Sequence, residues 1–161
     1  MKENISRIII GSEEWCALPG LGIPAIKARV DSGARASSIH ALNICAFRRG
    51  KDDWVSFEIP PLQQDDHTVL QCERPVIELR PVKSSNGLSE TRYVVRTTLQ
   101  LGEANWDIEL TLANRATMAY RMLLGREAMR DRVLIDPSQS FCLGDIGDDQ
   151  IAEKYSHRRD A

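Results

Sequence analysis

Hydrophobic and polar residues alternate along most of this chain, as they do in strands that bury one face. The alternation runs through Ile23–Val30, Trp54–Ile59 and Tyr93–Leu101, and it resumes over Trp106–Leu112. A period of two residues is typical of a half-buried β-strand. Because Gly102–Asn105 supplies turn residues between the last two segments, we expect these segments to form a long hairpin.

Only one segment before the last residues of the chain has a helical pattern. It is Arg126–Arg132, which follows Gly125 directly. The pattern as a whole therefore predicts a mostly β fold, in a barrel-like or sandwich arrangement. We expect one domain over residues 1–144, since a chain of 161 residues is the usual size of a single domain. Residues 145–161 hold few apolar side chains among many charged ones, which predicts a polar, flexible or partly helical tail.

Composition and charge exclude some classes of protein. The 21 basic and 23 acidic residues give a formal net charge of −2, so we expect no direct binding to nucleic acid. Sixteen of the cations are arginines, and Arg80–Arg96 is locally positive. The longest apolar run near the start, Ile8–Ile10, is far shorter than the roughly 20 residues of a membrane-spanning helix, and no signal peptide is recognisable. We expect a cytoplasmic protein without a membrane partner.

Cysteines and histidines are scattered, which argues against a metal or redox site. No two cysteines lie within the spacing of about two to four residues that is typical of structural zinc ligands. A glycine-rich phosphate-binding loop with lysine and serine or threonine is also absent from the sequence. We therefore expect no metal, no ATP and no other cofactor.

The most informative segment is Ala28–Arg35, in which a predicted strand leads directly into Asp31, Ser32 and Gly33. A turn at this point presents a carboxylate at the end of a strand, and glycine can adopt the positive φ of a sharp turn. Taken alone, the segment is an ordinary turn. A second segment, Arg121–Glu127, places two apolar residues and a glycine before the predicted helix.

The two segments together resemble the retropepsin-like aspartic peptidases, in which a strand ending in Asp-Ser-Gly or Asp-Thr-Gly packs beside an apolar-apolar-Gly strand. One bacterial family is more similar still, through Arg29–Ala41, Val82–Gly87, Thr111–Met118 and Met122–Pro137. That family is labelled both as ATP-dependent zinc proteases and as retropepsin-like aspartic endopeptidases, and it is associated with an ATP-grasp glutamate ligase that acts on a ribosomal protein. The resemblance implies an acid-protease barrel with one short helix after the supporting motif Leu123, Leu124, Gly125 and Arg126.

The resemblance also implies an aspartic-type peptidase that works as a homodimer, because each subunit would supply one catalytic aspartate, Asp31. Two carboxylates about 3 Å apart share one proton, so that one activates water while the other stabilises the oxyanion. Ser32 would tie the two turns together across the dimer axis. Gly33 would let the backbone turn, and Ala34 would leave space for the substrate main chain.

Arg35 stands where retroviral members of the wider group usually have an acidic residue. An arginine at this position would attract an acidic substrate instead. Together with Lys83, Arg92 and Arg96, it leads to the hypothesis that the substrate is a glutamate-rich peptide or protein tail. In this hypothesis Ala34 and Arg35 bind substrate, together with Lys83 and Arg92.

A flap that covers the substrate is predicted in a hairpin tip. Lys83–Glu90 is our choice, with Asn86 and Gly87 as substrate-binding residues, because its turn signal is stronger than that of Arg48–Asp53. Flaps of this kind close over a bound substrate and exclude water.

Two alternatives to the peptidase remain open at this point. The chain could be a non-catalytic β-barrel module that binds a ribosomal or ligase partner through its arginines. It could also be a zinc-dependent protease, as the family label suggests, with His40, Cys45 and His67 as ligands that converge from distant positions.

Overall fold

The computed structural model describes residues 6–63, 65, 67–83, 86–115 and 118–159, with the side chains of 157–159 left out, and most of these residues form β-strands. The strands are β1 (Ile8–Ile10), β2 (Glu13–Leu18), β3 (Ile23–Val30), β4 (Ser37–His40), β5 (Leu42–Arg49), β6 (Asp52–Ile59), β7 (Leu70–Pro75), β8 (Glu78–Lys83), β9 (Ser89–Leu101), β10 (Ala104–Ala113), β11 (Met122–Leu124) and β12 (Val133–Ile135). A 3-10 turn covers Pro19–Leu21, and the α-helices are α1 (Arg126–Met129) and α2 (Asp148–Arg159). The mostly β fold is confirmed.

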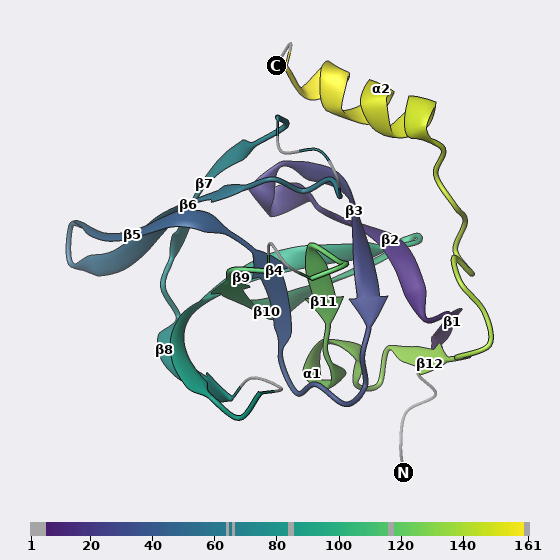
Figure 1. Cartoon of the computed structure of the whole chain (residues 1–161), viewed down its shortest axis with the longest axis horizontal. Helices are drawn as coiled ribbons and strands as arrows, with labels where there is room; N and C mark the ends of the chain where they lie inside the picture. The colour runs from purple at the N-terminus through teal and green to yellow at the C-terminus, as the bar shows by residue number, and fades with distance from the viewer. Residues whose placement is uncertain (1–5, 64, 66, 84–85, 116–117, 160–161) are drawn as a thin grey trace.

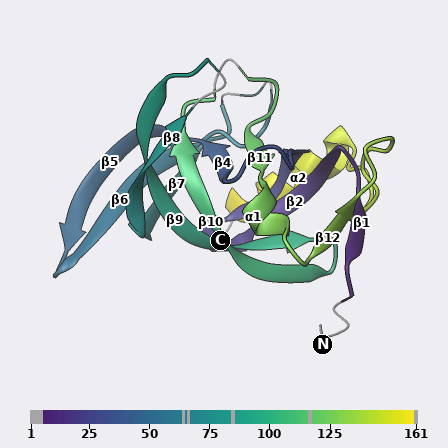
Figure 2. The same ribbon diagram turned by 90° about the horizontal axis from the view of Figure 1, so that it is seen from below.

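Seven strands form the main sheet, in the order β10-β4-β11-β3-β2-β9-β8 (Figure 1). Since β9 also pairs with β10, the sheet bends back on itself. Only one register pair, Ala17 with Gln100, joins β2 to β9, so the ring of strands is barrel-like and not a closed barrel. Strands β5, β6 and β7 form a second sheet, whose β5–β6 hairpin projects from the body in Figures 1 and 2. A parallel pair, β1 and β12, makes a third small sheet.

The strands predicted from the alternating pattern are present. Strand β3 has the predicted bounds, and β9 and β10 form the predicted hairpin, with Ala104 opposite Leu101 at the turn. Along β10, Ile108 and Leu110 are buried while Asp107 is exposed and Glu109 is half-buried. The two-residue period therefore reports correctly which face of this hairpin meets the core.

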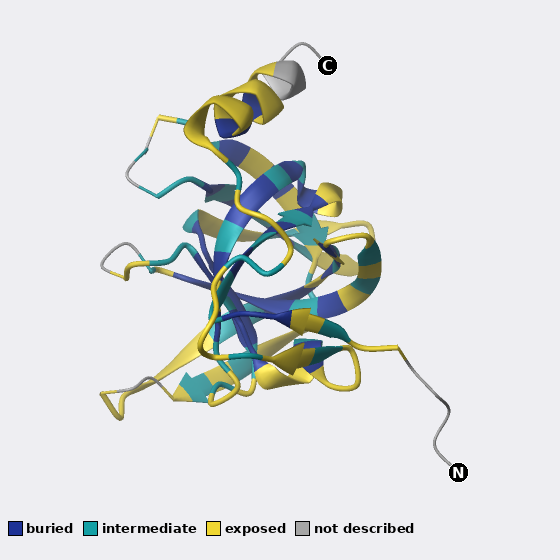
Figure 3. Cartoon of the chain, turned by 90° about the vertical axis from the view of Figure 1, so that its right-hand side faces the viewer, coloured by how far each residue is buried: buried dark blue, intermediate teal, exposed yellow. Residues whose placement is uncertain are grey.

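Both larger sheets contribute to one hydrophobic core. The largest fully buried side chains are Phe57, Ile10, Leu18, Ile23, Ile26, Ile39, Ile59, Leu99, Leu101, Leu110, Leu112 and Met122. Figure 3 shows the buried segments gathered inside the bent sheet, with exposed segments around them. Burial of this apolar surface is the main driving force for folding, and it fixes the strand that carries the candidate site.

Helix α2 packs against the outside of β3. Its residues Ile151 and Tyr155 are buried, and the Tyr155 hydroxyl donates a hydrogen bond to the carbonyl oxygen of Ala25. These two residues are four positions apart and so lie on one face of the helix. The segment predicted as a polar tail thus contains a helix, and its flexibility stays a prediction. In the described part of the chain, no helix is long and apolar enough to cross a membrane.

A buried carboxylate holds the two ends of the β domain together. Glu14 on β2 is 0% exposed and accepts three backbone N–H groups: Gly11 at 2.7 Å, Cys142 at 2.8 Å and Leu143 at 3.1 Å. An anion can be buried at tolerable cost only where such donors replace water. Glu14 therefore attaches the segment after β12 to the β1–β2 turn.

This arrangement predicts a large effect of Glu14→Gln on stability. The amide of glutamine would direct an N–H group at backbone N–H groups, so we expect the free energy of unfolding to fall by about 3 kcal/mol. Chemical denaturation followed by circular dichroism would measure it. The control is Glu13→Gln on the same strand, where the side chain is half-buried and we expect a change below about 0.5 kcal/mol. Equal effects of the two substitutions would contradict the role of Glu14.

Candidate active site

The carboxylate of Asp31 lies at the end of β3, at the start of the loop that leads to β4. The N–H of Asp31 donates to the carbonyl oxygen of Leu124 at 3.0 Å, and its own carbonyl oxygen accepts from the N–H of Ala34 at 3.2 Å. The N–H of Gly33 donates to the Asp31 Oδ1 atom at 2.9 Å. Asp31 is half-buried while Ser32 and Gly33 are exposed, so the carboxylate is held in place and remains accessible.

Gly33 provides space beside the Asp31 carboxylate rather than a special backbone angle. Its φ lies outside the left-handed region, so the positive φ expected from the sequence is wrong. A Cβ atom at this position would lie 3.1 Å from Oδ1 of Asp31. Glycine therefore lets the backbone N–H approach the carboxylate and donate to it without crowding.

The second sequence motif lies directly beside the loop. Strand β11 runs parallel to β3, with Leu124 opposite Val30. The next residue, Gly125, donates its N–H to the buried Ser37 Oγ atom at 3.0 Å. A Cβ atom on Gly125 would lie 2.4 Å from the carbonyl oxygen of Ala36, which is closer than real Cβ contacts come. Only glycine permits this approach of β11 to the loop.

The first residues of α1 also hydrogen-bond to the loop between β3 and β4. The N–H of Arg126 donates to the carbonyl oxygen of Ala34 at 2.7 Å, and the Arg126 Nη1 atom donates to that of Ser32 at 3.0 Å. The N–H of Glu127 donates to the carbonyl oxygen of Arg35 at 3.0 Å. The structure thus brings together the two segments that carried the resemblance, while their roles in catalysis stay predictions.

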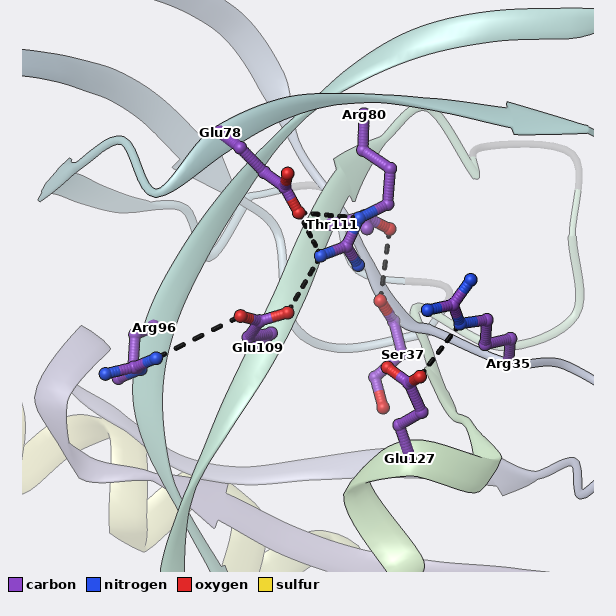
Figure 4. A network of polar contacts seen from close by, with 8 residues as sticks. All are labelled: Arg35, Ser37, Glu78, Arg80, Arg96, Glu109, Thr111 and Glu127. Atoms are coloured by element: carbon purple, nitrogen blue, oxygen red, sulfur yellow. Dashed lines mark hydrogen bonds and ion pairs between the residues drawn. The ribbon is translucent and has the colours of Figure 1, made fainter.

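Arg35 has a partner within the chain. Its Nε atom donates to Oε1 of Glu127 at 2.8 Å, and this hydrogen bond lowers the pKa of Glu127 (Figure 4). The Arg35 side chain is 77% exposed, so solvent screens the pair. Part of its charge is already balanced, and its role in attracting substrate stays a prediction.

A network of alternating charges lies next to this pair (Figure 4). Arg80 on β8 donates to Glu78 and, at 2.8 Å, to Glu109 on β10, and Arg96 lies 4.0 Å from Glu109. Hydrogen bonds to Glu109 and Glu78 raise the pKa of Arg80. The network borders a cavity of about 330 Å³ whose lining also includes Ser37 of β4. Each cation here has a carboxylate partner, so the network is structural in character.

Arg115, which the sequence analysis did not select, is attached to β4 behind the loop. Its backbone N–H donates to the Nδ1 atom of His40 at 2.8 Å. Its guanidinium donates to the Ser38 Oγ atom and to the carbonyl oxygen of Tyr120, each at 3.2 Å. The residue is half-buried. Its segment, Thr111–Met118, carried part of the resemblance, but the sequence analysis gave Arg115 itself no role.

Arg115 interacts electrostatically with two residues that the sequence analysis did select. Burial lowers its pKa, the positive charge of Arg92 lowers it further, and the negative charge of Asp31 opposes both effects. The Arg92 side chain is 17% exposed and pairs with Glu90 at 2.6 Å. Arg115 therefore interacts electrostatically with Asp31 and also with Arg92, which is one of the predicted substrate-binding residues.

The predicted flap coincides with the β8–β9 hairpin, whose tip lies on the same lower side of Figure 1 as the loop between β3 and β4. Lys83, Asn86 and Gly87 are exposed, and Gly87 has a φ of 85° that suits glycine. Residues 84–85, also predicted at the tip, lie outside the described residues. The β5–β6 turn at residues 48–53 projects elsewhere, on the second sheet. Which hairpin covers a substrate stays a prediction.

The side chains named for a zinc site do not form one in the described residues. There, no group of three or more His, Cys, Asp and Glu side chains could hold a metal ion. His40 is buried and accepts a hydrogen bond from Arg115, whereas Cys45 and His67 are exposed.

Proteins named probable alpha-L-glutamate ligase are close in sequence to this chain. Those from Desulfotalea psychrophila and Shewanella pealeana are 57% and 59% identical over 156 and 155 residues. The matches cover 97% and 96% of this chain but 34% and 33% of those proteins. The chain thus spans about a third of the length of these relatives.

The fold is also similar to that of a solved structure. The crystal structure of Lpg0085, a protein of unknown function from Legionella pneumophila, matches with a TM-score of 0.72 and 26% identity. The match covers 86% of this chain and 99% of that one. The family model described as "Retropepsin-like aspartic endopeptidase RimB" matches residues 9–144, which include the Asp31 loop, β11 and α1. The chain therefore belongs to the RimB-like family of retropepsin-like aspartic endopeptidases.

Proposed function

We propose that the chain is an aspartic-type peptidase that acts as a homodimer with one Asp31 in each subunit. The observation that carries the proposal is the half-buried carboxylate of Asp31, which the N–H of Gly33 holds at the end of β3. The backing of this loop by Leu124 and Gly125 supports it, since the two motifs that carry the resemblance lie side by side through bonds to the N–H of Asp31 and to the hydroxyl of Ser37. A single chain supplies one such aspartate, and the reaction needs two.

The mechanism follows from placing two Asp31 carboxylates across a two-fold axis. At about 3 Å apart they share one proton, because two negative charges at that distance repel strongly. The ionised carboxylate takes a proton from water as the water oxygen attacks the peptide carbonyl carbon. The protonated carboxyl group donates to the developing oxyanion, and the proton taken from water then passes to the leaving amine. No covalent intermediate forms.

The substrate that we propose is a glutamate-rich peptide or protein tail. Arg35 lies in the loop after Asp31, and the positive charge of Arg115 interacts with Asp31, which favours a negatively charged chain. Relatives that contain a matching segment are named as probable glutamate ligases. A glutamate-extended protein, which such a ligase would produce, is therefore the natural candidate substrate for this chain. The ligase itself would be a partner, in the same chain or in another.

The first test of this proposal is hydrolysis of a glutamate-extended peptide by the wild-type protein and by Asp31→Asn. Asparagine keeps the shape of the side chain and cannot exchange the proton, so we expect the rate to fall by about a hundredfold or more. Asp131→Asn is the control, because Asp131 lies beyond α1 and its φ of 64° suits asparagine. We expect the control to keep wild-type activity.

A chelator in each assay separates the alternatives. Hydrolysis that survives the chelator and is lost in Asp31→Asn supports the aspartic mechanism. Loss with chelator alone would support the zinc protease, and binding of the peptide without hydrolysis by either protein would support the non-catalytic module.

Arg35 can be tested through its partner. Because the Arg35 hydrogen bond lowers the pKa of Glu127, Arg35→Gln should raise that pKa toward its ordinary value, as an NMR titration would show. If Arg35 also attracts acidic substrates, the same substitution should raise KM for the glutamate peptide by about threefold. Arg48→Gln on the β5–β6 hairpin removes one equally exposed charge and should leave KM unchanged. A raised pKa of Glu127 with an unchanged KM would indicate that Arg35 pairs with Glu127 and does not attract the substrate.

A further inference from the structure

A cavity of about 610 Å³ lies between helix α2, strands β2 and β3, and the loop between β6 and β7. Trp15 and Leu62 give it apolar surface, as do Ile151 and Tyr155 of α2. None of its described lining residues belongs to the Asp31 loop, β11 or α1, and α2 lies on the side of the molecule away from that loop (Figure 1). Ligand pockets usually have volumes of about 300–1,000 Å³. The cavity is therefore separate from the candidate active site and large enough for a ligand of its own.

Lys27 brings a positive charge to this cavity. Its Nζ atom lies 5.2 Å from the centre of the Trp15 ring and 5.6 Å from that of Phe141, which are cation–π contacts. The Trp15 ring is held in place, because its Nε1 atom donates to Oδ1 of Asp145 at 2.9 Å. Among the described residues Lys27 forms no ion pair. The half-buried ammonium group is therefore available to a carboxylate of a ligand.

Gln63 brings an unused hydrogen-bond acceptor to the same cavity. Its Nε2 atom donates to the carbonyl oxygen of Ala119, and since only the NH₂ end of the amide can donate, this bond also identifies the oxygen end. The Oε1 atom of Gln63 is buried and has no hydrogen-bond partner among the described residues. A buried acceptor without a donor costs free energy, so an N–H group of a ligand that reached Oε1 would remove this cost.

Two carboxylates in the lining restrict the charge of the ligand. Asp65 already accepts hydrogen bonds from the N–H groups of His67 and Thr68 and from the Thr68 hydroxyl. Asp148, in the first turn of α2, has no such bond in the described part of the chain. The described lining thus holds one cation, Lys27, and two anions, so a purely anionic ligand would be repelled. A ligand that carries both a carboxylate and an ammonium group matches both signs of charge.

We propose that this cavity binds a zwitterion with an apolar side chain, either a free amino acid or a short peptide with unblocked ends. Lys27 binds the carboxylate, and the ammonium group donates to Oε1 of Gln63 and to Asp148. The apolar side chain packs on Trp15 and Leu62. The inference goes beyond the proposed function and does not depend on it, since no residue of the candidate active site lines the cavity.

The experiment measures binding of the dipeptide Leu-Leu by NMR. The readout is the Trp15 Nε1–H signal, identified by its disappearance in Trp15→Phe. Leu-Leu amide lacks the carboxylate and N-acetyl-Leu-Leu lacks the ammonium group, so we expect Leu-Leu to shift the signal and to bind about tenfold more tightly than either. Free leucine is the fourth probe, and its affinity relative to Leu-Leu distinguishes an amino-acid site from a peptide site, both of which support the inference.

Lys27→Gln tests the group that binds the carboxylate. Glutamine removes the positive charge, so this variant should bind Leu-Leu and Leu-Leu amide equally, with a loss of about tenfold for Leu-Leu. The control is Lys51→Gln at the exposed β5–β6 turn, which removes one positive charge away from the cavity and should keep the wild-type preference. Circular dichroism would establish that each variant is folded.

Equal binding of Leu-Leu and either blocked peptide by wild-type protein would overturn the inference, and this comparison needs no variant. So would a Trp15 signal that stays in place with all four probes, or an unchanged preference in folded Lys27→Gln. A protein without peptidase activity that still binds Leu-Leu through Lys27 would retain the cavity site and refute only the proposed function.

Discussion

The close approach of β11 and α1 to the loop after β3 is the constraint on which the candidate site depends. Gly125 lies against the carbonyl of Ala36 with no room for a Cβ atom, and this contact brings the carbonyl of Leu124 to the N–H of Asp31. Three of the bonds that hold the loop join backbone to backbone, with Asp31, Arg126 and Glu127 as donors. Backbone bonds between paired strands leave little freedom, so the carboxylate is set in place before any substrate binds.

The charges around this loop fall into two groups with different consequences. Arg35 donates to Glu127, and Arg80 donates to Glu78 and Glu109, so part of their positive charge is balanced within the chain. The guanidinium of Arg115 donates instead to neutral acceptors, the hydroxyl of Ser38 and the carbonyl oxygen of Tyr120.

Much of the fold follows from local pattern, and the fine structure of the site does not. The period of two residues predicts β3 and the β9–β10 hairpin, and the paired motifs at Asp31 and Gly125 lie side by side as the resemblance implies. The sequence predicted helix α2 only as one possible state of a polar tail, because among its described side chains few are apolar and buried, namely Ile151 and Tyr155. The hydrogen bond from the Gly33 N–H to the Asp31 carboxylate, by contrast, is the local turn that an aspartate at this position favours.

The position of Arg115 illustrates a second limit of prediction from the sequence. The residue is about 84 positions from Asp31 in the chain, and only the pairing of β10 with β4 brings its loop to the site. Composition showed an excess of arginine. It could not distinguish the arginines that pair with a carboxylate from Arg115, whose guanidinium donates to neutral acceptors. Long-range strand pairing, rather than the two-residue pattern, brings Arg115 to Ser38 on β4.

The central claim is that one active site needs Asp31 from two subunits, and a mixing experiment tests it most directly. Wild-type and Asp31→Asn subunits would be combined in equal amounts, allowed to exchange, and assayed for hydrolysis at constant total protein. Random pairing leaves about one quarter of the dimers with two aspartates, so the account predicts about one quarter of the activity of wild-type protein alone. Activity of about one half, as expected if each subunit works independently, would contradict the account.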